Sequence, residues 1–155
     1  QLQLQKINNN LFKEHAFYVS MSQKPYFKRQ NDWKQTMKQI LPQDRLVANV
    51  ATTPFTKWKN SDGSDSNTEI LQLGDSKKLG TGFHIYRMAP GSSSEAHEHQ
   101  GDEEFFVIEG SLRDNDGTIY GKGDLILLKD GTQHFSVSDA GCLLAVYIPR
   151  EETNL

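Results

Sequence analysis

Two stretches of the sequence decide the fold: Gly91–Gly110, which reads GSSSEAHEHQGDEEFFVIEG, and Gly123–Ser138, which reads GDLILLKDGTQHFSVS. In both, short runs rich in β-branched, aliphatic and aromatic residues lie between glycines, a pattern typical of β-strands joined by tight turns. Similar runs recur at short intervals, with the spacing of a barrel or sandwich. They cover residues 83–88, 103–109, 118–120, 124–128, 134–138 and 143–148. The sequence therefore predicts an all-β domain.

On the N-terminal side of these strands, the strand pattern becomes weaker and then gives way to helical spacing. Residues 46–51, 55–59 and 69–73 are further β-prone runs. Before them, Trp33, Met37, Ile40 and Leu41 recur at helical spacing ahead of Pro42, which predicts one short helix. Residues 1–30 are polar and rich in Gln and Asn, so we expect an extended arm. The predicted organisation is an arm and short helix over residues 1–44, a barrel over 45–150 and a C-terminal tail over 151–155.

The composition limits the classes of function. A chain of 155 residues suits a single domain. Its formal net charge of −3 argues against nucleic acid as the partner, because phosphate binding needs a concentrated basic face. No run reaches the roughly 18 apolar residues of a membrane span, and the lone Cys142 favours a reducing compartment. We therefore expect a cytoplasmic protein with neither nucleic-acid nor membrane partners.

Three histidines and a glutamate in the two stretches suit one metal ion. His97 and His99 are two residues apart, which on a β-strand directs both imidazoles to one face. Glu103 opens the next predicted strand and His134 opens a later one. Three imidazoles and a carboxylate suit Fe, Mn, Ni, Co or Zn. Four such ligands leave one or two coordination positions open.

The first stretch resembles the first motif of the cupin family. That motif is a glycine, five residues, His-x-His, three or four residues, Glu, six residues and a glycine. Its places are filled by Gly91, His97, His99, Glu103 and Gly110. Glu104 is a competing carboxylate, but only Glu103 has both motif spacings. The resemblance implies metal ligation by His97, His99 and Glu103.

The second stretch resembles the second cupin motif, which ends in the remaining histidine ligand. Gly123, Gly131 and His134 match it. Lys129 stands where the family usually has proline, and Ser138 where it usually has asparagine, so turn rigidity and local hydrogen bonding depart from the pattern. The resemblance covers residues 45–149 and implies a double-stranded β-helix, the RmlC-like jelly-roll barrel of the cupins.

Within the superfamily, the chain looks most like the cupin domain of zinc-binding anti-sigma factors and like single-domain, acetylacetone-cleaving dioxygenases. Anti-sigma activity resides in a separate helical zinc domain with its own Cys and His ligands, and one cysteine with one predicted helix does not provide that domain. The resemblance implies a metal-dependent dioxygenase that cleaves a carbon–carbon bond in a small diketone-like or hydroxyketone-like substrate, with Fe(II) favoured and Zn, Mn or Ni as alternatives. The other hypotheses are a non-catalytic cupin that binds zinc or a small ligand as a sensor or structural protein, and an epimerase or isomerase acting on sugars.

Strand alternation gives candidates for the pocket walls and for an interface. Phe105 and Val107 share the face of Glu103, and Ser136 and Ser138 share that of His134. Further polar candidates are His84, Tyr86, Arg87 and Tyr147. On the opposite face, the apolar Phe106 and Ile108 need a cover. We expect a homodimer in which the N-terminal helix or arm packs on the neighbour.

Overall fold

The computed structural model describes residues 37–155, of which Pro42–Leu155 form one compact unit built almost wholly from antiparallel strands. The strands are β1 (Thr56–Lys59), β2 (Asp65–Leu71), β3 (Gly82–Met88), β4 (Ser92–Ser93), β5 (His97–Glu98), β6 (Glu103–Asp114), β7 (Ile119–Gly121), β8 (Leu125–Leu128), β9 (Gln133–His134), β10 (Ser136–Ser138), β11 (Cys142–Ile148) and β12 (Thr153–Asn154). Every run predicted from residue 83 onward contains a strand, although β6 extends to Asp114 and the run over residues 134–138 is divided between β9 and β10. The all-β prediction is confirmed.

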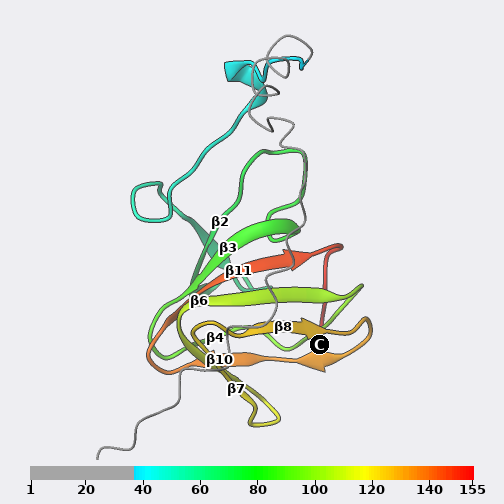
Figure 1. Cartoon of the computed structure of the whole chain (residues 1–155). Coiled ribbons are helices and arrows are strands. Elements are labelled where there is room, and N and C mark those ends of the chain that lie inside the picture. Colours follow the sequence, from blue (N-terminus) through cyan, green and yellow to red (C-terminus); the bar gives the residue numbers. More distant parts are fainter. Residues whose placement is uncertain (1–36) are drawn as a thin grey trace, which may run out of the picture. The chain divides into compact units, whose positions relative to one another are not determined.

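The long strand β6 holds the two layers of the curled sheet together (Figure 1). Its first part pairs with β11 on one side and β8 on the other, continuing the order β1-β2-β3-β11-β6. Its last part, residues 111–114, pairs instead with β7 and β10. A separate three-stranded sheet has the order β12-β5-β9. Because one continuous strand takes part in both layers, the sheet curls round an interior.

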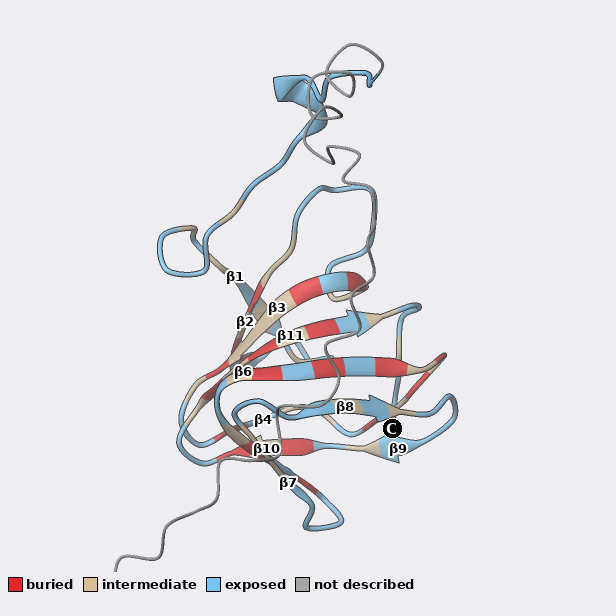
Figure 2. Cartoon of the chain, in the orientation of Figure 1, coloured by how far each residue is buried: buried red, intermediate tan, exposed pale blue. Residues whose placement is uncertain are grey.

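Buried and exposed residues alternate along β3, β6 and β11, which is visible as stripes in Figure 2. The inward faces form the core, whose buried members are Met88, Phe105, Val107, Leu112, Cys142, Leu144 and Val146. Alternation with a period of two is what a sheet with one face on a core and one on solvent requires. These core residues make the centre of the interior apolar, while other inward positions carry buried polar side chains, among them His97, His99 and Glu103.

A β-bulge in β6 changes which residues face inward. The pairing of β6 with β11 shifts register between Leu143 and Leu144. Before the shift the odd-numbered positions within residues 103–107 are buried, whereas after it Leu112 and Asp114 are buried. A simple period of two continued from Glu103 would have placed both outside. The bulge thus brings the carboxylate of Asp114 into the interior.

The predicted N-terminal helix is not found among the described residues. Residues 31–36 of that prediction, like the expected arm over 1–30, lie outside the described residues. Residues 37–41 are not helical, and a single 3₁₀ turn, η2 (Pro42–Asp44), follows them. Among the described residues, no helix has the length and apolar character needed to cross a membrane.

The strand predicted over residues 46–51 is also wrong. Asn49 forms a turn there: its carbonyl accepts a hydrogen bond from the Thr53 amide at 2.8 Å, and its side chain accepts one from the Ala51 amide at 2.8 Å. Val47 is 81% exposed. Asn side chains compete for backbone amides in this way and stabilise turns in place of sheet pairing. The first strand therefore begins only at Thr56.

Candidate metal centre

The four predicted ligands lie together in one cluster. His97 lies on β5 and pairs directly with His134 on β9, while His99 follows β5 and Glu103 begins β6. One nitrogen or oxygen from each of the four lies within 4.8 Å of the others, so the cluster could hold a metal ion. The His99 side chain is 1% exposed. Backbone pairing between β5 and β9 brings together histidines far apart in sequence.

Hydrogen bonds orient the first two imidazoles. Nδ1 of His97 lies 2.8 Å from the Glu95 carbonyl, which can only accept, so this nitrogen carries the proton. Nδ1 of His99 lies 2.9 Å from the hydroxyl of Thr132. That hydroxyl donates its own proton to the Lys129 carbonyl at 2.7 Å, so it accepts from His99. Both rings therefore keep the Nε2 lone pair free for a metal.

The third imidazole is held by a carboxylate that the sequence analysis missed. Nδ1 of His134 lies 3.2 Å from Oδ1 of Asp114, a close ion-pair distance without the direction of a full hydrogen bond. Asp114 also accepts hydrogen bonds from the hydroxyls of Ser136 and Tyr120. Carboxylates in this position fix the ring of a ligating histidine and make it more basic. In the sequence, Asp114 stands next to a segment rich in turn residues, so nothing there distinguishes it from an ordinary turn carboxylate.

Several buried atoms in the cluster have no hydrogen-bond partner. They are Nε2 of His99, Nε2 of His134 and Oε2 of Glu103, with Nδ1 of His134 and Oε1 of Glu152. Nε2 of His99 lies 2.8 Å from Oε2 of Glu103, but without hydrogen-bond geometry. Burying unpaired polar atoms is costly, and structures rarely tolerate several in one place. A cation among these lone pairs would satisfy them together, so the donor set fits a metal.

The side chains of the cluster shift one another's pKa values. Burial raises the pKa of Glu103, but the adjacent imidazoles of His134 and His99 outweigh it and hold that pKa at about 2. Burial lowers the pKa of His134, but Asp114 and Glu103 overcome it and raise that pKa to about 9. In the metal-free protein, Glu103 and His134 therefore form an ion pair at neutral pH.

This ion pair predicts how the stability of the metal-free protein depends on pH. The Glu103 contribution is present above its ordinary pKa of 4.5 and is lost as the pH falls towards 2. The His134 contribution is complete below 6.5 and is lost as the pH rises through about 9. Urea unfolding of chelator-treated protein should therefore show falling stability from pH 6.5 to 9. The fall should shrink in His134→Gln, and an equal slope in both proteins would contradict the assignment.

We expect Asp114→Asn to lower metal affinity by about 10- to 100-fold, the usual effect of removing a carboxylate behind a metal-binding histidine. The amide keeps the size of the side chain but removes the charge that holds His134. Competition with a chromophoric chelator measures the change. Asp116→Asn, in the following exposed turn, is the matched control and should bind as wild type does. Equal affinity in the two variants would exclude the role assigned to Asp114.

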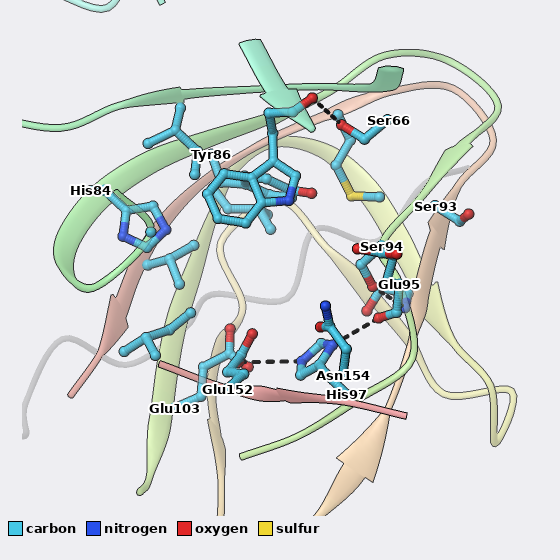
Figure 3. Close-up of a pocket in the computed structure, with 18 of the residues that line it drawn as sticks. Ser66, His84, Tyr86, Ser93, Ser94, Glu95, His97, Glu103, Glu152 and Asn154 are labelled. Carbon is cyan, nitrogen blue, oxygen red and sulfur yellow. Dashed lines mark hydrogen bonds and ion pairs between the residues drawn. The ribbon is translucent and has the colours of Figure 1, made fainter. Parts of the chain in front are cut away.

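A cavity of about 320 Å³ adjoins the cluster (Figure 3). Its apolar wall includes Trp58, Ile70, Met88, Leu144, Val146 and Ile148. Its polar lining includes Ser94, Glu95 and His84. Nδ1 of His84 lies 3.0 Å from the Gly82 carbonyl, and burial lowers the pKa of its imidazole. His84 is therefore a neutral imidazole with its Nε2 available as an acceptor.

The predicted pocket residues divide into two groups. Tyr86, Phe105 and Ser136 line the cavity. Val107 and Ser138 are buried but do not line it: Val107 packs in the core, and the Ser138 hydroxyl donates to a backbone carbonyl at 2.6 Å.

The prediction for Tyr147 is wrong, and Arg87 is not part of the cavity lining either. The alternation of β11 turns Tyr147 outward, where it is 43% exposed beside Phe83. Arg87 pairs with Glu69 at 3.1 Å and lies over the ring of Phe55. The sequence pattern alone did not determine which side chains of these strands point into the interior.

The two departures from the second motif are compensated locally. Where the family usually has proline, Lys129 forms an ion pair with Asp102 at 3.1 Å. The other oxygen of Asp102 accepts the Asp130 amide at 3.0 Å. The turn before His134 is therefore tied to the segment before Glu103, and Ser138 has the hydrogen bond described above. Neither departure disturbs the four candidate ligands.

The fold and the donor set together define a cupin. The chain belongs to the family described as the ChrR cupin-like domain, whose model matches residues 44–149. No curated protein sequence matches this chain. The resemblance stated from the two motifs is thus confirmed.

Solved structures show the same fold at low sequence identity. The polyketide cyclase RemF from Streptomyces resistomycificus is 19% identical, with a TM-score of 0.56 over 72% of this chain and 85% of that one. The acetylacetone dioxygenase from Acinetobacter johnsonii is 14% identical, with a TM-score of 0.59 over 77% of this chain and 82% of that one. A chain of the complex of Rhodobacter sphaeroides SigE with the anti-sigma ChrR is 16% identical, with a TM-score of 0.51 over 68% of this chain. The match spans about half of that chain, 51%. These three proteins have different activities, and such distant likenesses show the fold alone.

Proposed function

We propose that the protein is an Fe(II)-dependent dioxygenase that cleaves a carbon–carbon bond in a small diketone-like or hydroxyketone-like substrate. The observation that carries this proposal is the position of the three-histidine, one-glutamate cluster beside a cavity of about 320 Å³ with a largely apolar wall. His97, His99, Glu103 and His134 would hold the ion. A bound divalent iron would supply a Lewis acid for two adjacent substrate oxygens and a site for dioxygen.

The chain's own groups fit an enolisable substrate. The apolar wall, with Trp58 and Met88, excludes water from the cavity and so strengthens electrostatic interactions within it. Burial raises the pKa of Tyr86 to about 12, so its hydroxyl stays protonated and can donate a hydrogen bond to a substrate oxygen. Nε2 of the neutral His84 can accept the acidic proton between two carbonyl groups. These roles orient the substrate and move one proton.

Oxygen uptake tests the proposal. Protein loaded anaerobically with Fe(II) is mixed with a panel of small diketones and hydroxyketones, and oxygen consumption and cleavage products are followed together. We expect uptake that requires both iron and substrate, with no uptake by the zinc form. In His84→Gln the rate should fall by about 10²- to 10⁴-fold at unchanged iron content. Fully loaded protein that consumes no oxygen with any substrate of the panel would overturn the proposal.

A second candidate function is a metal-holding cupin without turnover, which binds zinc or a small ligand. One observation favours it: the carboxylate of Glu152 lies 3.2 Å from Nε2 of His97, on the side where a substrate would approach the ion. Tight zinc retention, with no oxygen uptake after exchange for iron, is the result expected of this candidate.

We also propose a homodimer, because one face of the larger sheet is apolar and uncovered among the described residues. Phe83 and Tyr147 are paired across β3 and β11, Phe106 and Leu125 across β6 and β8, and Leu127 follows Leu125 on β8. All five are exposed, Leu125 by 74% and Phe83 by 66%. Glu104 pairs with both Tyr147 and Leu127 and is the polar member of this group. Exposed apolar side chains grouped in this way mark an interaction surface. The arm expected to pack on the neighbour lies outside the described residues.

Light scattering at micromolar concentration should therefore give the mass of two chains. The double variant Phe106→Lys with Leu125→Glu places charges on the face and should give the mass of one chain. Its metal content should be unchanged, since neither residue touches the cluster. A wild-type protein that scatters as a single chain would contradict the dimer.

A further inference from the structure

The segment after β11 returns to the metal cluster. Strand β12 pairs with β5, with Asn154 opposite His97. The Leu155 amide donates to the Ala96 carbonyl at 3.0 Å, and Glu151 forms an ion pair with Lys78. This segment is thus fixed to the same strand that carries the first candidate ligand, and the sequence analysis had treated it as a tail.

Glu152 in this segment directs its carboxylate at the cluster. Its Oε1 lies 3.2 Å from Nε2 of His97 and 3.7 Å from Nε2 of His99. These are the two nitrogens whose lone pairs are left free by the hydrogen bonds at Nδ1. Oε1 is itself buried and has no hydrogen-bond partner. Figure 3 shows the Glu152 and Glu103 side chains close together beside His97.

We propose that Glu152 is a fifth protein ligand, which occupies one of the coordination positions that the other four leave open. The inference rests on the metal centre of the proposed function. Two carboxylates match the charge of a divalent ion, and a set of imidazole and carboxylate donors suits Fe(II), Mn(II) or Zn(II). A substrate that binds through two oxygens would have to displace this carboxylate.

Cobalt binding tests the ligand assignment without reference to activity. Co²⁺ absorbs visible light more intensely as its coordination number falls. We expect Glu152→Gln to bind Co²⁺ at least about tenfold more weakly, by analogy with other carboxylates around metal sites, and to show more intense absorption per bound ion than wild type. Glu151→Gln, which alters the neighbouring exposed carboxylate, is the matched control and should match wild type in both respects. Thermal unfolding of the metal-free variants verifies that both fold.

Three other results would overturn the assignment. Identical affinity and spectrum in Glu152→Gln and wild type would exclude ligation. Weaker binding with an unchanged spectrum would make Glu152 a positioning residue that acts through His97. Wild-type protein that binds no Co²⁺ would remove the metal centre itself, and the proposed function with it. Ligation by Glu152 in a protein that consumes no oxygen would, in contrast, support this inference and overturn only the dioxygenase.

Discussion

His99→Ala should abolish metal retention. His99 is the most deeply buried of the four candidate ligands, with its Nε2 2.8 Å from Oε2 of Glu103 and its ring fixed by Thr132. Losing a residue behind a metal ligand typically weakens binding by about 10- to 100-fold. Losing a ligand itself removes a donor bond as well, so we expect a loss greater than about 100-fold.

Chelator competition and metal analysis after desalting measure this effect. The control is His84→Gln, which alters another buried imidazole of the cavity wall and should retain the ion. Metal should also stabilise wild type by about 2.7 kcal/mol at a free concentration 100 times its Kd, and this gain should vanish in His99→Ala. Full metal content at wild-type affinity in His99→Ala would contradict the proposed ligand set.

Gly110→Ala should have the largest effect on the fold itself. Gly110 has a φ of 76° near the bulge between β6 and β11. A Cβ there would lie 2.1 Å from the carbonyl oxygen of Gly141 and 2.9 Å from Cα of Cys142. Both contacts are backbone, so no side chain can rotate away. We expect a loss of about 3 kcal/mol or more, which combines left-handed backbone strain with displacement of a central strand pair.

Gly117→Ala separates these two causes. Gly117 also has a positive φ, 89°, but an added Cβ would meet no atom within 4 Å. Only the backbone strain of about 1–2 kcal/mol should remain. Urea unfolding of both variants gives the comparison. Equal losses would mean that the close approach of β6 and β11 at Gly110 has no energetic consequence.

The sequence predicted the strands from residue 83 onward because glycine-rich turns separate them and their side chains alternate. It also predicted which four side chains would meet. His97 and His99 are near each other in sequence, and the spacing of the motifs supplied Glu103 and His134. The structure adds the direct pairing of β5 with β9, which places His97 opposite His134.

Other features depend on contacts that local sequence does not encode. Asp114 faces inward only because a bulge shifts the alternation of β6. Glu152 reaches the cluster only because the two residues of β12 pair with β5. In the sequence, this segment resembles a polar tail. Residues 46–51 have strand-like composition but pair with no strand of the described residues. Tyr147 could be assigned to a face only once the register of β11 was known.

Metal stoichiometry after anaerobic Fe(II) loading and removal of unbound ions tests the central claim most directly. The account predicts one iron per wild-type chain and almost none in His99→Ala, with both proteins folded. Wild-type protein that retains no metal, or equal metal content in the two proteins, would show that His97, His99, Glu103 and His134 do not form a metal centre.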